Sequence, residues 1–183
     1  MTDHKKLAIL RIMSTIGSPV YISVPELLPL LIFTAINLSV KYGISPETPL
    51  IYAAYGLILC DIKGDIEHGY KFGKLALKLI DRVGIRGNKA EAIYMVTTFI
   101  KYWNEPLRNT LKSYLEGYES GMERGNLEFA AVCLHTYCMY SMISGKELQE
   151  VEKEMVRYTG IIKQLKQTNS LHYLEIYHQS LSN

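Results

Sequence analysis

The chain has 183 residues, of which 48% are hydrophobic and 21% are charged. This composition is typical of a folded globular protein and excludes the disordered, collagenous and disulfide-rich classes. The 20 basic and 18 acidic residues are spread along the chain and leave a net charge of +2, so the sequence lacks the basic stripe of a nucleic-acid binder. We therefore expect a globular protein with no nucleic-acid partner.

The sequence predicts a cytoplasmic location. Its longest apolar stretch, residues 27–40, contains a proline and an asparagine and is shorter than the roughly 20 residues that cross a membrane, so we expect no membrane partner. The N-terminus lacks the apolar run and cleavage site of a signal peptide. Cys60, Cys133 and Cys138 lie in apolar helical patterns, where a thiol acts as a small hydrophobic group and suits a reducing compartment.

Residues 1–44 predict looser N-terminal helices. Apolar residues recur at helical spacing over residues 5–16 and again over 27–42, which predicts two helices. Pro19 and Pro25 lie between them, and a proline lacks the N–H that a helix interior uses. We therefore expect a kink or a break between these helices.

Residues 45–83 predict a helical hairpin. Ser45-Pro46 is a favourable helix start, because serine accepts a first-turn N–H and proline needs no partner there. Gly64-Asp65 then ends this helix and caps the next one. The second helix carries a stripe of small residues that would let a neighbouring helix approach closely. The stripe consists of Gly69, Gly73 and Ala76.

Residues 86–124 predict a second hairpin. The glycines of residues 84–88 predict a loop, and helical periodicity resumes over residues 88–103. Pro106 starts the partner helix, which runs to residue 124.

Residues 126–168 predict a third hairpin, followed by a terminal helix at residues 170–182. Asn126 is a favourable N-terminal cap for the first helix of this hairpin. Ser144 and Glu147 have the spacing of a capping box, which predicts that the second helix starts there.

The hairpins recur about every 40 residues, a period typical of helical-repeat solenoids. No alternating apolar run predicts a strand. We therefore predict a single all-α domain over residues 1–183, with antiparallel hairpins stacked as a tetratricopeptide-like α-solenoid of eight or nine helices. The tetratricopeptide likeness lies in Gly64-Asp65, Gly69 and Ala76-Leu77, and residues 125–130 echo it at a different place in their hairpin.

No pattern in the sequence predicts a catalytic, cofactor or metal site. Residues 69–74 are one residue short of a phosphate-binding loop and lie inside a predicted helix, whose N–H groups are already committed. Cys133, His135 and Cys138 cannot share one helical face, which disfavours zinc ligation. We expect no catalytic residue, no cofactor and no metal, so the segment is not predicted to be an enzyme.

The 14 tyrosines include several pairs three or four residues apart, which places both rings of a pair on one helical face. Such rings either pack between helices or line an aromatic groove that grips a partner, and the sequence leaves both readings open. The candidate interaction residues are Tyr52, Tyr55, Tyr114, Tyr118, Tyr137 and Tyr140.

Four segments of the chain resemble one region of very large bacterial signalling proteins. They are NLSVKYG at 37–43, the run from YGLILCDIKGD to KLIDR at 55–82, SGKELQEVEKEM at 144–155 and YLEIYHQ at 173–179. In that family a serine/threonine-kinase-like domain and an AAA-type signal-transduction ATPase precede the helical region, and GAF and histidine-kinase domains follow it. The resemblance implies that this chain corresponds to the helical region of such a two-component signalling protein, either as a fragment of the longer chain or as an independent small protein.

The resemblance implies a role without a mechanism, because the family's catalytic motifs lie in its other domains. We expect a scaffold that links or regulates the neighbouring ATPase, GAF or kinase domains, or that binds a signalling partner. The alternatives are an effector-binding regulatory domain and an enzyme. Because the ends of a solenoid need polar caps, we also expect self-association or partner binding through the terminal helices.

Overall fold

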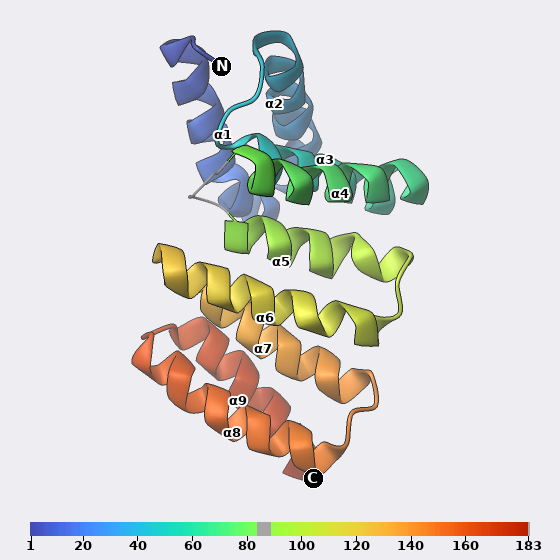
Figure 1. Ribbon diagram of the computed structural model, residues 1–183, viewed down its shortest axis with the longest axis vertical. Coiled ribbons are helices and arrows are strands. Elements are labelled where there is room, and N and C mark those ends of the chain that lie inside the picture. The colour runs from blue at the N-terminus through green and yellow to red at the C-terminus, as the bar shows by residue number, and fades with distance from the viewer. Residues whose placement is uncertain (84–88, 183) are drawn as a thin grey trace. The chain divides into compact units, whose positions relative to one another are not determined.

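A computed structural model describes residues 1–83 and 89–182 of the chain (Figure 1). Within these ranges the regular structure consists of nine α-helices and two short 3-10 turns, and within each unit most helices pack on a neighbour in sequence. The predicted class, an all-α chain of stacked helices of the α-solenoid type, is therefore confirmed. The loop predicted at residues 84–88 lies outside the described residues.

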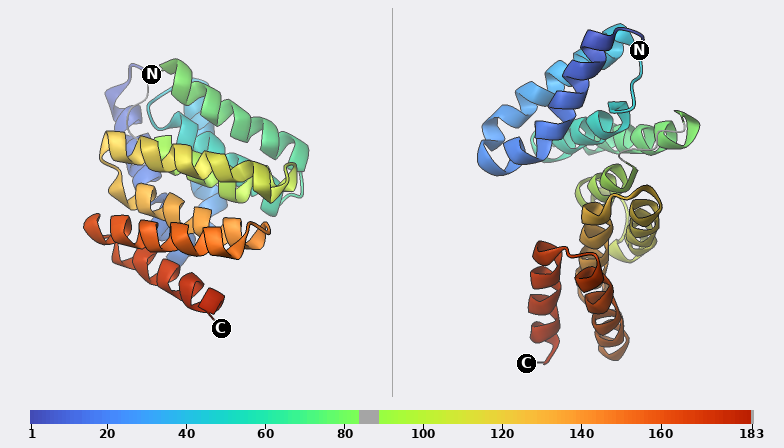
Figure 2. Two further views of the ribbon diagram at one scale, coloured as in Figure 1. Left: turned by 60° about the horizontal axis from the view of Figure 1, so that its bottom comes forward. Right: turned by 90° about the vertical axis from the view of Figure 1, so that its left-hand side faces the viewer.

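Contacts divide the chain into two compact units, and the assignment of all 183 residues to one domain stays a prediction. Unit 1 comprises Met1–Asn88 and Thr98–Asn104, and unit 2 comprises Lys89–Thr97 and Glu105–Asn183. Two further views show the helices of each unit lying side by side (Figure 2). The helices of unit 1 are α1 (His4–Ser23), α2 (Leu28–Tyr42), α3 (Thr48–Asp61) and α4 (Ile66–Val83).

Helix α5 (Lys89–Phe99) contributes its first nine residues to unit 2, and its last two residues and the 3-10 turn at Lys101–Trp103 belong to unit 1. The remaining helices of unit 2 are α6 (Leu107–Arg124), α7 (Leu127–Ile143), α8 (Leu148–Gln164) and α9 (Thr168–Ser182). The sequence predicted one helix over residues 88–103, so the switch to a 3-10 turn after Phe99 was missed.

Helix α1 is longer than predicted. It continues through Pro19 to Ser23, and a 3-10 turn at Pro25–Leu27 connects it to α2. Pro19 cannot donate to the carbonyl of Thr15, but both residues are exposed, so water can take the place of the missing donor. At the other end of the helix, the Asp3 side chain accepts from the backbone N–H groups of Lys5 and Lys6.

The packing of α3 against α4 depends on glycine. A Cβ on Gly56 of α3 would stand 2.8 Å from the carbonyl oxygen of Gly69 on α4 and 3.4 Å from the backbone nitrogen of Gly73. A Cβ on Gly69 would collide with the sulfur of Cys60. The predicted stripe of small residues therefore does allow the two helix backbones to approach closely.

The packing of α6 against α7 is similarly close. A Cβ on Gly117 would stand 2.6 Å from the sulfur of Cys133, and a Cβ on Gly121 would stand 2.8 Å from the Cβ of Ala130. This helix pair has the most extensive contact within unit 2, whereas α7 and α8, which the sequence placed in one hairpin, touch over a smaller surface.

The α3–α4 pair and the α6–α7 pair carry equivalent residues at positions 61 apart in the sequence. The equivalent residues are Gly56 and Gly117, Gly64 and Gly125, Asp65 and Asn126, and Gly69 and Ala130. Gly64 and Gly125 both have positive φ, 69° and 76°, which favours glycine in each turn. The side chains of Asp65 and Asn126 then accept from the N–H three residues later, at 3.2 and 3.3 Å.

This equivalence corrects the interpretation of residues 125–130. The sequence placed that stretch at a different position in its hairpin, because α6 was paired with the helix before it. In the structure residues 125–130 form the turn and first helical residues of the α6–α7 pair, as residues 64–69 do for α3 and α4. The caps predicted at Asp65 and Asn126 are confirmed.

Two predicted helix starts were wrong. The Ser144 hydroxyl does not cap α8 but donates to the Ser141 carbonyl, and the Lys146 N–H also donates to Ser141, so this segment closes the end of α7. Helix α8 begins only at Leu148, without a side-chain cap. Likewise α3 begins at Thr48 rather than at residue 46, and the Thr48 hydroxyl accepts from the Ser45 N–H.

The space around two glycines predicts opposite effects when each is replaced by alanine. We expect Gly121→Ala to destabilise the fold by about 1–3 kcal/mol, because the new methyl has no room. Gly160→Ala on α8, where no atom lies within 4 Å of the added carbon, should stabilise it by about 0.5–1 kcal/mol through better helix propensity. Urea denaturation measures both, and equal effects would contradict the packing described.

Candidate interaction surfaces

The two candidate tyrosines of unit 1 pack between helices. Tyr52 and Tyr55 on α3 both meet the ring of Phe72 on α4 edge-to-face, with centroids 5.7 and 4.7 Å apart. Tyr55 also meets Phe33 on α2 at 6.0 Å. Such edge contacts are favourable beyond the area they bury, so these rings connect α2, α3 and α4 while part of each remains accessible.

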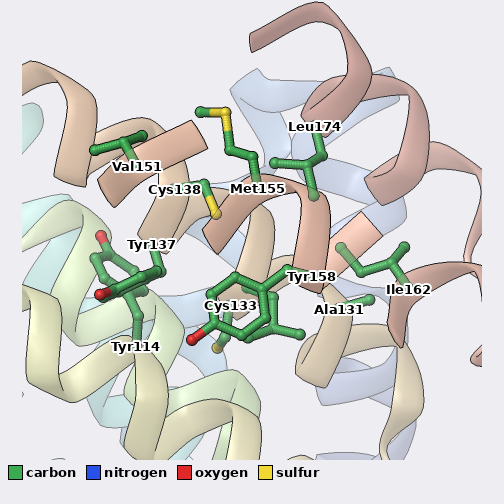
Figure 3. Packing of buried hydrophobic residues seen from close by; sticks show 11 residues of the cluster. Tyr114, Ala131, Cys133, Tyr137, Cys138, Val151, Met155, Tyr158, Ile162 and Leu174 are labelled. Atoms are coloured by element: carbon green, nitrogen blue, oxygen red, sulfur yellow. The ribbon is translucent and has the colours of Figure 1, made fainter. Parts of the chain in front are cut away.

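Two of the four candidate tyrosines in unit 2 lie in its core (Figure 3). Tyr114 is fully buried and Tyr137 is 6% exposed. Tyr114 meets Tyr140 at 5.4 Å, and Tyr137 meets Tyr158 at 5.9 Å. The rings of Tyr114 and Tyr137 therefore serve packing and offer no open face to a partner.

The remaining candidates, Tyr118 and Tyr140, are partly buried against the same core. The structure thus divides the six tyrosines between an aromatic cluster in unit 1 and the core of unit 2 and does not gather them within one unit. A role in partner binding stays a prediction for the four that are partly accessible.

A polar network closes the core of unit 2 between α7 and α8. The Tyr137 hydroxyl donates to Glu154 at 3.0 Å, and the Lys146 ammonium donates to the same carboxylate oxygen at 2.7 Å. Burial, followed by the negative charge of Glu154, raises the pKa of Tyr137. Both donors keep their protons at neutral pH, so the network is a structural link between the two helices rather than a proton relay.

Glu91, in the first turn of α5, is a carboxylate that sequence patterns did not single out. Burial, followed by the negative charge of Glu128 in the first turn of α7, raises the pKa of Glu91 from 4.5 to about 7. No sequence motif marks Glu91, because its raised pKa arises from burial in the folded chain. Glu91 and Glu128 alone form no acid–base pair with a nucleophile, so they do not define a catalytic site.

The raised pKa of Glu91 predicts that the stability of the fold falls as pH rises. Because the folded-state pKa lies above the unfolded one, the protonated acid stabilises the fold below pH 4.5, and this contribution is lost as pH rises through about 7. At pH 8 we expect Glu91→Gln to be about 2–3 kcal/mol more stable than the wild type.

At pH 4 the stability gain of Glu91→Gln should disappear, because the wild-type carboxyl is then protonated in both states. Denaturant titrations at the two pH values measure the difference. The matched control is Glu119→Gln, an exposed position on α6. A gain that is the same at both pH values would show that the burial of charge is not its cause.

The cysteines are buried and His135 is partly buried, without a catalytic arrangement. Cys60, Cys133 and Cys138 are free and buried, and burial raises the pKa of Cys133 and Cys138 to about 12, so both stay thiols, as the sequence predicted. Burial lowers the pKa of His135 to about 4, and its ring stacks on Tyr173 of α9 at 5.3 Å. Among the described residues, no group of three or more His, Cys, Asp or Glu is placed to hold a metal ion.

Helices α1 and α2 carry much of the exposed apolar surface of the chain. Half of the large apolar side chains that are exposed among the described residues lie between Ile9 and Ile44, about one fifth of the sequence. On α1 only Leu10 is buried, while Ile12 is 60% exposed. Solvent-exposed apolar surface at this density typically marks an interaction site.

Comparisons with protein-family models, with curated proteins and with solved structures find no match to this chain. None of the described helices combines the length and the apolar character that crossing a membrane requires.

Proposed function

We propose that this chain is a cytoplasmic, non-catalytic helical-repeat scaffold of a bacterial signal-transduction protein. In this role it binds and regulates neighbouring ATPase, GAF or kinase domains, of the kind that accompany the helical region it resembles. The observation that carries the proposal is the apolar surface of α1 and α2, which is far richer in exposed large apolar side chains than the rest of the described chain.

The way α1 is buried supports the binding of a partner to its exposed apolar face. Helix α1 is attached to unit 1 through the buried Leu10, which packs with Ala35 of α2 and Ile51 of α3. The helix therefore has one face in the core and a second, apolar face that solvent reaches. Exposing several isoleucines to water is unfavourable at about 25 cal/mol for each Å², so a partner that covers them gains binding free energy.

The proposal is tested by titrating the purified chain with an AAA-type ATPase domain, a GAF domain and a histidine-kinase domain of that class. We expect at least one to bind, and Ile12→Ser/Ile16→Ser to weaken the binding at least about tenfold, which corresponds to roughly 1.4 kcal/mol. Both positions are exposed, so the variant should keep its fold, which circular dichroism checks.

The matched control is Val156→Ser on α8, whose side chain is 59% exposed, close to the 60% of Ile12. It should leave binding unchanged. If none of the three domains bound the wild-type chain, or if the purified chain itself hydrolysed ATP or transferred phosphate, the proposal would be wrong.

A further inference from the structure

We infer that the outer face of α1 binds an acidic amphipathic helix of a protein partner. This inference rests on the proposed function, because it specifies the chemistry of the partner. It follows from two observations on α1 that are independent of each other: the spacing of its exposed isoleucines, and the sign of the charges that accompany them.

Three of the four exposed isoleucines of α1 form one stripe. Ile9, Ile12 and Ile16, called here the isoleucine stripe, are separated by three and four residues and are exposed. This spacing places them on one side of the helix, away from the buried Leu10. A single row of apolar residues at these intervals matches the seam between two packed helices, so a partner helix covers it better than a flat surface does.

The charges near the stripe are basic. Residues 4–25 contain Lys5, Lys6 and Arg11 and no aspartate or glutamate. Residues 1–44 hold four basic and two acidic residues, while residues 45–183 hold 16 of each, so the whole net charge of +2 arises in the N-terminal helices. The carboxylate nearest along the sequence, Asp3, accepts from two backbone N–H groups at the start of α1.

Two of these cations are available to a partner. Lys5 continues the isoleucine stripe by one further step of four residues, whereas Arg11 follows Leu10 on a different face of the helix, about 100° around the axis from Ile12; both are exposed. No carboxylate within the described residues pairs with either side chain. Lys6 differs, because its ammonium lies over the Tyr42 ring of α2, 5.3 Å from the centroid.

Complementarity therefore selects an acidic helix as the occupant. Glutamates or aspartates that flank an apolar stripe would meet Lys5 and be attracted at longer range by Arg11 on the adjacent face, whereas like charges across an interface are repelled. A second copy of this chain would bring the same basic groups against each other at α1, without an acidic partner. An anionic lipid surface shares the sign, but a helix that binds one presents a broad apolar face, whereas the isoleucine stripe is a single narrow row.

The test compares two labelled amphipathic peptides that have the same length and the same apolar stripe. One carries glutamates beside the stripe, and the other carries lysines. By fluorescence anisotropy we expect the glutamate peptide to bind the full chain at least about tenfold more tightly, with an affinity that falls as salt is added. Ile12→Ser/Ile16→Ser should abolish the binding of both peptides.

Charge reversal provides the second arm. Lys5→Glu/Arg11→Glu should invert the preference, so that the lysine peptide binds more tightly. The control Lys153→Glu/Arg157→Glu reverses two exposed cations on α8 and should leave the preference for glutamate unchanged. Sedimentation of the same samples determines whether copies of the chain pair instead.

Each contrary result has a separate meaning. Equal binding of the two peptides, or binding of neither, would overturn the acidic-helix inference, while the proposed function would still stand if a signalling domain bound through Ile12 and Ile16. Preferential binding to phosphatidylserine vesicles would assign the face to a lipid surface, and dimerisation that Ile12→Ser abolishes would assign it to a second copy. Either result would also overturn the inference.

Discussion

The close approach of helix backbones at small residues is the constraint on which each unit depends. Gly56 and Gly69 bring α3 and α4 together, and Gly121 and Ala130 do the same for α6 and α7. At such separations a single methyl group has no space, so these positions admit little variation in volume. The turns between the paired helices reinforce the geometry, because each has a glycine with positive φ followed by a side-chain cap.

The elements around these close pairs are held by larger side chains. In unit 2, Tyr114 and Tyr137 fill the space between α6, α7 and α8, and the hydroxyl of Tyr137 reaches Glu154. In unit 1, α1 has a much smaller share in the core, through Leu10. The distribution of burial therefore separates a well-packed scaffold from an N-terminal helix whose outer face is available for binding.

The sequence located the helices, but it did not show which helices pack most closely on each other. Apolar periodicity located the helices, and Gly64-Asp65 and Gly125-Asn126 marked two turns correctly. Periodicity cannot tell which neighbour a helix packs on most closely, and the spacing of Gly117 and Gly121 was the overlooked signal for α6 and α7. Glu91 and the outward direction of the isoleucine stripe were also missed, because burial depends on contacts between helices that are distant in sequence.

The central claim is that each unit is held by a close helix pair, and that α1 is weakly attached to unit 1 and binds a partner. Hydrogen–deuterium exchange of the isolated chain, read by mass spectrometry, tests it most directly, because exchange reports the free energy of local opening. We expect the amides of α3, α4, α6 and α7 to exchange slowest and those of α1 to exchange much faster. Protection of α1 equal to that of α3 and α4 would contradict the claim.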